Sequence, residues 1–348
     1  EYLETVLNSD ARLKKGRKRA LVGINLNTVQ LLTADYGFQY TQNLIKKAAE
    51  ALSGYCTQNC MLFYAFYNRF VFYILDYKDK DELIGFAQTV AGTLESLFVM
   101  ERIGGGIGIL EIGPDDESDS DTLFRHLLVA SEKAASAEKD FAICFYDDKL
   151  QALVNRERDI MDALGAIAAD ADTNDQIYLQ YQPIANIKTG LVCGFEALAR
   201  LRTEKLGQVP PLEFIPIAEK TKLIIRIGEK VIVNSFRFLN RLKEEGYDDV
   251  SVSINISIIQ LLHPDFTSRL FELVREMRVN PKNICLEITE SVFASDYEVI
   301  NRNLERLKAA GMHVAIDDFG VGYSSLAREK ELKADFMKID KYFVDNLM

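Results

Sequence analysis

The chain has 348 residues, of which 48% are hydrophobic and 27% charged, and its formal net charge is −11 at pH 7. This length accommodates two domains, and the composition is that of a globular protein with full hydrophobic cores. The negative charge argues against non-specific binding to nucleic acid or to an anionic membrane surface, so a phosphate-bearing ligand would need a metal ion or a few well-placed cations.

Residues 1–148 combine strand-like and helical patterns. Apolar runs at 20–26, 61–75 and 103–110 predict strands, and the second run is long enough for a hairpin that turns at "YNR". Between the runs, apolar residues recur at helical spacing over 41–55 and 80–98. We therefore predict an α+β domain of the palm kind. The glycines of "GGGIG" precede no GK[ST] motif, so we interpret them as strand positions where another backbone packs closely, and not as a phosphate loop.

A connecting helix is predicted over residues 149–172. Its apolar stripe, which charged residues interrupt, consists of Leu150, Leu153, Ile160, Leu164 and Ile167. A coiled-coil dimer seam is the alternative interpretation, but the pattern is shorter than the three to four heptads that would indicate one.

Residues 173–348 alternate strand and helix patterns. The predicted strands are 177–184, 191–201, 250–257, 284–289, 313–317 and 336–340. Helical patterns at 267–278 and 298–311 lie between them, the second closed by Gly311 as a C-terminal cap. Repeated βα units imply a parallel sheet, and six strands in one series favour a (β/α) barrel. In such barrels the chemistry lies at the carboxyl ends of the strands.

Polar residues recur at or near the predicted strand ends. They are Glu196, Asn255, Glu287, the adjacent pair Asp317 and Asp318, and Lys338. The middle spacings are about 30 residues, which suits one βα unit each, so the barrel would bring all of these side chains to one mouth.

Carboxylates and an amide without histidine or cysteine form an oxygen-only ligand set, which suits Mg²⁺ or Mn²⁺ and not zinc or copper. Asp318 could hold a second ion, and two ions stabilise the in-line displacement of a phosphodiester. Lys338 could position or help deprotonate the water, or neutralise charge on phosphate. Gln182 and Arg200 are candidate ligand contacts. The alternatives are solvated acids at strand ends and a surface ion pair between Lys338 and Asp340.

Other chemistries have little support in the sequence. "DDFG" is similar to the kinase DFG, but no glycine-rich loop or HRD motif precedes it. The cysteines Cys56 and Cys60 in "CTQNC" have no second Cys or His pair to complete a zinc site. Five scattered cysteines indicate free thiols in a reducing cytoplasm. No apolar stretch reaches the ~20 residues of a membrane span, and the chain starts with neither a signal peptide nor a methionine, so we expect a segment of a longer cytoplasmic protein.

The second half closely resembles EAL domains, which hydrolyse cyclic di-GMP. The motifs that carry the resemblance are "YQPI", "GFEALARL", "SINIS", "LEITES", "AIDDFGVGYSSL" and "MKIDKYFV", in family order. The resemblance implies a TIM-like barrel, dependence on Mg²⁺ or Mn²⁺, and cleavage of the cyclic dinucleotide to linear pGpG.

The resemblance also assigns roles to residues of this chain. Metal binding falls to Glu196, Asn255, Glu287 and Asp317, the second metal to Asp318, the nucleophilic water to Lys338, and ligand contacts to Gln182 and Arg200. Glu290 would hold the loop after "IDDFG", which lies at a dimer contact in the family, and Gly320 and Gly322 would give that loop its freedom. A homodimer through this domain follows as an expectation.

EAL domains continue past the "KID" strand with an "EGVE"-type segment, which carries another metal-ligand glutamate, and a "QG" segment with a glutamine for the ligand. This sequence ends at Met348. Because six strands cannot close an eight-stranded barrel, we expect the domain to be C-terminally incomplete here. Either this sequence is a piece of a longer chain or, less in keeping with its intact acids, the domain itself is truncated.

The first half is similar to GGDEF domains, the diguanylate cyclase palm that commonly precedes EAL. Asn25 and Asn27 stand where metal-binding aspartates are expected, and Thr33 and Gln42 replace the guanine-contacting pair. Thr57 and Cys60 stand at the ends of the absent inhibitory-site pattern. The signature hairpin is replaced by Phe66, Tyr67, Asn68, Arg69 and Phe70. Without acids this palm cannot hold two metals, so we predict no cyclase activity and a regulatory, dimerising or structural role.

The sequence therefore predicts a degenerate GGDEF domain over 1–148, a connecting helix over 149–172 and an EAL domain over 173–348. The predicted function is hydrolysis of cyclic di-GMP, modulated by the first domain and by a possible upstream sensor. The alternative is a binding module, either a cyclic di-GMP receptor or a protein-interaction scaffold without useful catalysis.

Overall fold

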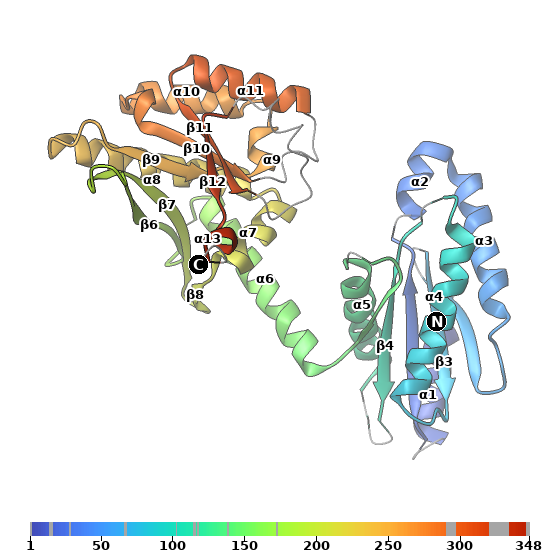
Figure 1. Cartoon of the computed structure of the whole chain (residues 1–348). Helices are drawn as coiled ribbons and strands as arrows, with labels where there is room; N and C mark the ends of the chain where they lie inside the picture. The colour runs from blue at the N-terminus through green and yellow to red at the C-terminus, as the bar shows by residue number, and fades with distance from the viewer. Residues whose placement is uncertain are drawn as a thin grey trace. The chain divides into compact units, whose positions relative to one another are not determined.

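Two β-sheets organise the chain, one in each of two compact units, Glu1–Asn155 and Arg156–Met348. The computed structural model describes residues 2–13, 17–27, 29–65, 68–101, 103–113, 116, 118–137, 139–171, 173–289, 297–319 and 334–345. Figure 1 shows the elements of both units along the chain.

The first unit is built on a five-stranded sheet in the order β2-β3-β1-β4-β5. Its strands are β1 (Arg19–Asn25), β2 (Cys60–Ala65), β3 (Arg69–Leu75), β4 (Gly106–Ile112) and β5 (Ala142–Phe145). The predicted hairpin is confirmed as β2 and β3, and the central strand β1 pairs antiparallel with both β3 and β4. Every residue of β1 is buried, because helices cover both faces of the sheet.

The helices of this unit divide between the two faces. They are α1 (Tyr2–Leu13), α2 (Val29–Tyr36), α3 (Phe38–Ser53), α4 (Lys80–Phe98) and α5 (Ser120–Ala135). Apolar residues of α3 and α4 pack with Val22 and Ile24 on one face, and those of α1 and α5 pack with Leu21 on the other. Asp79 and Asp119 are the N-caps of α4 and α5. Their carboxylates accept hydrogen bonds from backbone N–H groups in the first turn of each helix.

The glycines of "GGGIG" allow α5 to approach the sheet closely. A Cβ atom on Gly106 or Gly108 would collide with the backbone of α5 at Ala135 or Ser131. This confirms the interpretation of these glycines as packing positions.

The connecting helix α6 runs over Asp148–Ala168, and its second half belongs to the second unit. Ile160, Leu164 and Ile167 are buried in one cluster with apolar residues of α7 (Pro211–Lys220) and α8 (Ile224–Glu244). Leu153 is exposed, so only part of the predicted stripe packs. The helix also ends before the predicted residue 172, and Asp170 adopts a positive φ of 53°. The buried residues of the stripe therefore pack against other helices of the same chain.

The second unit contains strands β6 (Gln176–Ala185), β7 (Val192–Thr203), β8 (Gly207–Val209), β9 (Ser251–Asn255), β10 (Ile284–Thr289), β11 (His313–Phe319) and β12 (Phe336–Ile339). They form one sheet in the order β12-β11-β10-β9-β7-β6, with β8 paired to β7. Neighbouring strands pair in parallel from β7 through β9, β10 and β11 to β12.

The prediction of an all-parallel series is wrong for β6, which pairs antiparallel with β7. Residues 186–191 connect the two strands, and so short a connection can form a hairpin but not a crossover. The described strands form an open series from β6 to β12, and closure of a barrel is not seen among them.

Helices cover one face of this sheet. The remaining elements are α9 (Ile258–Leu261), α10 (Phe266–Met277), the 3₁₀ turn η1 (Pro281–Asn283), α11 (Tyr297–Ala309) and α13 (Lys341–Asp345). Val252, Leu286 and Val314 pack with apolar residues of α8, α10 and α11, and Figure 1 shows α10 and α11 along this side. Gly311, with φ 90°, follows α11 as predicted for a C-terminal cap. Among the described residues, no helix combines the length and apolarity needed to cross a membrane.

Candidate functional site

The strand register places the predicted acids on the sheet face opposite the helices. Side chains alternate along a strand, so the residues between those that pack on the helices point the other way. Glu196 is level with Ser253 on the neighbouring strand, and Asn255 is level with Glu287. Asp317 lies on β11, the next strand along. Four adjacent strands therefore contribute polar groups to one surface.

Three carboxylates from this surface converge. One oxygen each of Glu196, Glu287 and Asp317 lies within 4.8 Å of the others. Lys338 of β12 contacts all three: its Nζ lies 3.0 Å from Glu196 Oε2, 2.7 Å from Glu287 Oε2 and 3.2 Å from Asp317 Oδ1. The ammonium therefore compensates part of the negative charge that the cluster gathers.

Asn255 joins this cluster through its amide. Its Nδ2 donates a hydrogen bond of 3.1 Å to Glu196 Oε1. Since the amide nitrogen is the donor, the Oδ1 atom remains as an oxygen that could bind a cation.

Glu287 is the most buried member of the cluster, with 2% of its surface exposed. Burial raises the pKa of Glu287 above its ordinary value, and the hydrogen bond and charge of Lys338 oppose the shift. For Lys338, burial acts to lower the pKa, but the hydrogen bonds and charges of Glu287, Glu196 and Asp317 outweigh it and hold the pKa above the ordinary value. The ammonium is thus charged at neutral pH.

Sequence reasoning missed Ser253. This residue is 5% exposed, and its hydroxyl acts to lower the pKa of the Glu287 carboxyl, against the larger effect of burial. It also interacts with the thiol of Cys285, whose pKa is raised to about 11, chiefly by burial. The signal was available in the alternation of "SVSIN", which puts Ser253 on the same face as Asn255.

The donor set fits a hard divalent cation. Oxygens of three carboxylates lie within 4.8 Å of one another, and the Asn255 amide lies beside one of them; carboxylate and amide oxygens are ligands of the kind that Mg²⁺ and Mn²⁺ prefer. The buried carboxylate of Glu287, whose charged form burial disfavours, would gain from a positive neighbour. Lys338 supplies one such charge and contacts one oxygen of each carboxylate.

The predicted ligand contacts lie beside the acids. Gln182 of β6 is directly opposite Glu196 in the antiparallel pair, so both side chains share a face. Arg200 donates through Nε to Gln180 Oε1 at 2.8 Å and through Nη1 to the Ala199 carbonyl at 2.9 Å.

A cavity of about 460 Å³ adjoins the acid cluster. Its lining includes Arg200, Asn255, Glu287, Phe214 and Glu219. A volume of this size accommodates a small-molecule ligand, with apolar walls and a few polar groups near the acids.

The prediction that Glu196 ends or follows its strand needs correction. Asn255 is the last residue of β9 and Glu287 lies within β10, as predicted, but Glu196 lies in the first half of β7. The strand β7 runs on past the site because it pairs with β6 and β8, a partnership that periodicity does not reveal.

Several predicted residues cannot be placed. Glu290, Gly320, Gly322, Phe66 and Tyr67 lie outside the described residues, and so does the side chain of Asp318, although its backbone belongs to β11.

In the first unit, the remaining residues of the altered hairpin have structural partners. Asn68 turns the hairpin with φ 64°, and Phe70 is buried in the core. Arg69 donates from Nη1 to Ser131 Oγ at 3.2 Å and pairs through Nη2 with Glu132 at 3.1 Å.

Neighbouring positions of this unit also carry neutral groups. Asn25 is buried opposite Arg69 in the sheet, and Asn27 Nδ2 donates to the Ala135 carbonyl. Thr33 Oγ1 hydrogen-bonds to Thr41 Oγ1 at 3.0 Å, and Gln42 is exposed. Among the described residues of this unit, acidic side chains form no cluster suited to a metal ion.

Comparison with known proteins gives a consistent assignment for the second unit. A model of the EAL domain family matches residues 165–348, more than half of the chain. The bifunctional diguanylate cyclase/cyclic di-GMP phosphodiesterase MucR of Pseudomonas aeruginosa is 32% identical over 250 residues, which are 71% of this chain and 35% of MucR. The probable cyclic di-GMP phosphodiesterase PdeI of Escherichia coli is 31% identical over 223 residues, 58% of this chain and 28% of PdeI.

The chain thus spans about a third of the length of these curated relatives. A solved structure of the S helix, GGDEF and EAL domains of Vibrio cholerae LapD, bound to c-di-GMP, covers 99% of this chain and 80% of its own, with a TM-score of 0.53. At 18% sequence identity this likeness concerns the fold alone.

Proposed function

This chain belongs to the EAL domain family, and from that premise we propose that it is a phosphodiesterase specific for cyclic di-GMP, which it hydrolyses to linear pGpG. The observation that carries the proposal is the convergence of Glu196, Glu287 and Asp317 on Lys338, beside a cavity lined by Arg200. Relatives named as cyclic di-GMP phosphodiesterases support the substrate class.

We assign metal binding to Glu196, Asn255, Glu287 and Asp317, with Asp318 for a second ion. Bound Mg²⁺ or Mn²⁺ would supply Lewis-acid stabilisation of the phosphodiester oxygens and a more acidic water.

The remaining roles fall to this chain's other side chains. Lys338, held by three carboxylates, would orient the attacking water and offset charge on the phosphate. Arg200 and Gln182 would contact the dinucleotide, the arginine through its two-pronged guanidinium.

The first unit is proposed to be a degenerate GGDEF domain without cyclase activity, over residues 1–148, joined through 149–172 to an EAL domain over 173–348. The neutral Asn25 and the ion-paired Arg69 support the loss of its metal site, and the fold likeness to the tandem LapD structure supports the domain type. The role of this first unit would be regulatory. The protein would lie in the cytoplasm, receive its signal from an upstream sensor, and form a homodimer through the EAL domain. Glu290, Gly320 and Gly322 would shape the loop at the dimer contact.

Turnover of cyclic di-GMP by the purified protein, with Mg²⁺ or Mn²⁺, tests the proposal. We expect pGpG as the product, and Glu196→Ala or Asp317→Ala should reduce the rate by at least about 10³-fold, since each removes a ligand of the reacting centre. A matched control is Glu204→Ala, which removes an exposed acid of the β7–β8 turn. A folded protein that gives no pGpG would contradict the proposal.

A receptor without catalysis is the second candidate. The observation in its favour is that the Lys338 ammonium contacts all three acids, so that the cluster is already compensated by a side chain. Tight binding of cyclic di-GMP without cleavage would select the receptor, and absence of both binding and cleavage would select a protein-interaction scaffold.

A further inference from the structure

We propose that Ser257, Gln260 and Glu219, named here the Ser257 network, position the amide of Asn255 for cation binding. The inference rests on the proposed metal centre and adds three residues to it. They act through Asn255 and do not themselves belong to the acid cluster.

The first part of the network is a capping box on α9, the helix that starts directly after the site. Ser257 is the N-cap, and its Oγ accepts a hydrogen bond from Ile259 N at 3.3 Å. In return, Ser257 N donates to Gln260 Oε1 at 3.1 Å. Such reciprocal bonds fix the direction in which a chain enters a helix. Here the entering chain is β9, whose last residue is Asn255.

The second part ties this cap to α7. Ser257 Oγ donates to Glu219 Oε1 at 2.6 Å, a short hydrogen bond of the kind that a charged acceptor makes. Glu219, Ser257 and Asn255 all line the cavity that adjoins the acid cluster. The cap is therefore fixed from within its own helix and by Glu219 of α7, which precedes Ser257 by 38 residues in the sequence.

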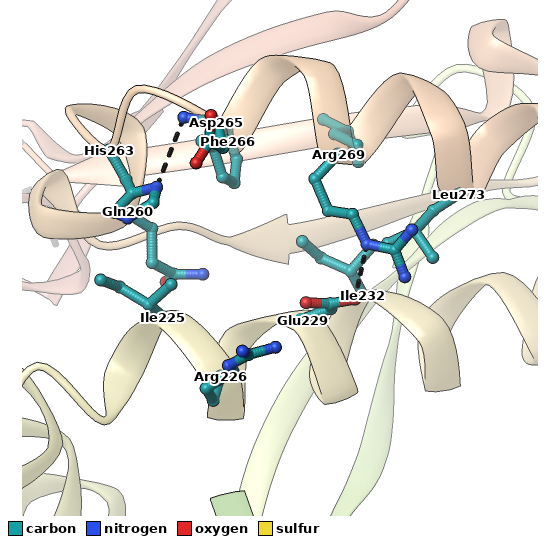
Figure 2. A pocket seen from close by; sticks show the side chains of 11 residues that line it. Ile225, Arg226, Glu229, Ile232, Gln260, His263, Asp265, Phe266, Arg269 and Leu273 are labelled. Atoms are coloured by element: carbon teal, nitrogen blue, oxygen red, sulfur yellow. Dashed lines mark hydrogen bonds and ion pairs between the residues drawn. The ribbon is translucent and has the colours of Figure 1, made fainter.

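The third part is the close contact of Gln260 with α8. Gln260 is 3% exposed, and a Cβ atom on Gly228 would collide with its amide. Figure 2 shows the Gln260 side chain extending toward the helix that carries Ile225 and Arg226. Because residue 228 is a glycine, α8 leaves space for the buried Gln260 side chain. If the Gln260 amide moved aside, this close packing against α8 would be lost.

These contacts bear on Asn255 because only Ile256 separates it from the cap. Ile256 N donates to the Glu287 carbonyl at 2.8 Å, which holds the backbone in register with β10. The Asn255 side chain is itself exposed, and its amide donates to Glu196. An exposed amide with one hydrogen bond depends on its backbone for orientation, and the Ser257 network restrains that backbone on the other side.

Mn²⁺ affinity, measured by electron paramagnetic resonance on the full chain, tests the inference apart from activity. Ser257→Ala and Gln260→Leu should each raise the Kd for Mn²⁺ about tenfold, the effect typical of residues that orient metal ligands. Ser257→Thr, which keeps the capping oxygen, should restore affinity close to that of the wild type. Asn280→Ala is the matched control, since it removes the cap of η1 at the opposite end of β10 and should leave the Kd unchanged.

A double-variant cycle separates positioning from general loosening. Ser257→Ala combined with Asn255→Ala should bind Mn²⁺ no more weakly than Asn255→Ala alone, because the network acts through that amide. Additive losses, or wild-type affinity in both Ser257→Ala and Gln260→Leu, would overturn the inference. If Ser257→Ala fails to fold, Gln260→Leu and Ser257→Thr decide it. A wild type that binds Mn²⁺ but cleaves no cyclic di-GMP would refute the phosphodiesterase and leave the network standing, whereas a wild type that binds no Mn²⁺ would refute the network.

Discussion

At the scale of single residues, Lys338 holds the candidate site together. Its ammonium lies within 3.2 Å of carboxylate oxygens of Glu196, Glu287 and Asp317, the second of which is almost fully buried. Carboxylates so close to one another repel strongly where water is scarce, and a positive charge among them removes most of that cost. A bound divalent cation could supply this compensating positive charge in place of Lys338.

Replacement of Lys338 by methionine should therefore destabilise the metal-free protein. We expect a loss of about 2 kcal/mol in the free energy of unfolding, less than for a fully buried pair because the lysine is partly exposed. Added Mn²⁺ should raise the melting temperature of this variant more than that of the wild type. Lys341→Met, at an exposed lysine three residues along, is the control. Equal melting temperatures of the metal-free variant and wild type would contradict this view of the site.

Ser253 permits a second test at this scale. Ser253→Ala removes a hydroxyl that favours the charged form of the buried Glu287 carboxylate, which should cost about 1–2 kcal/mol of stability and weaken Mn²⁺ binding. Ser251→Ala changes a serine of the same strand whose hydroxyl makes a long bond of 3.4 Å to the Cys193 carbonyl, and it should have little effect. Thermal unfolding of both variants decides the point, and equal effects would show that Ser253 is an ordinary strand residue.

At the scale of elements, α6 is the part of the connection that packs on the second unit. Leu164 is fully buried among residues of α7 and α8, whereas Leu153, about three turns earlier, is largely exposed. Ion pairs join the same half of the helix to α7 and to the β7–β8 turn: Arg156 with Glu213 at 2.6 Å, and Lys205 with Asp159 at 2.7 Å.

Truncation along α6 should therefore have uneven effects. Leu164→Ala should cost about 2–5 kcal/mol in the free energy of unfolding, because it leaves a cavity in a closed cluster. Leu153→Ala should change it by less than about 0.5 kcal/mol, as surface substitutions usually do. Urea denaturation followed by circular dichroism measures both. A large effect of Leu153→Ala would show that the exposed half of the stripe is covered, as a coiled-coil seam would cover it.

Periodicity predicted much of the fold at this scale. Strands β1, β4 and β10 and helices α4 and α11 fall on the predicted runs because each depends on local alternation of apolar and polar residues. The antiparallel pairing of β6 with β7 was not predicted, since pairing partners are set by contacts across the sheet. The acids of the site were identified individually, but Ser253, Glu219 and Gln260 were not: their roles follow from register and helix packing, which link residues far apart in the sequence.

At the scale of the whole molecule, the two units differ in the charges that they gather. The second collects three carboxylates around a lysine, while the first places Arg69, which pairs with Glu132, opposite the neutral Asn25 in its sheet. We therefore expect no cyclic di-GMP when the protein is incubated with GTP and Mg²⁺. Chromatographic analysis of the nucleotides checks this, with an active cyclase as the control, and formation of the cyclic product would contradict the assignment of the first unit.

The measurement that most directly tests the proposed function is turnover of cyclic di-GMP in water enriched in ¹⁸O, read by mass spectrometry. Attack of water on phosphorus with departure of the 3′ oxygen predicts linear pGpG with one ¹⁸O atom in its terminal phosphate, formed by the wild type and not by Glu196→Gln or Asp317→Asn. Unchanged cyclic di-GMP with the folded wild type, or labelled product at the wild-type rate from both variants, would contradict it.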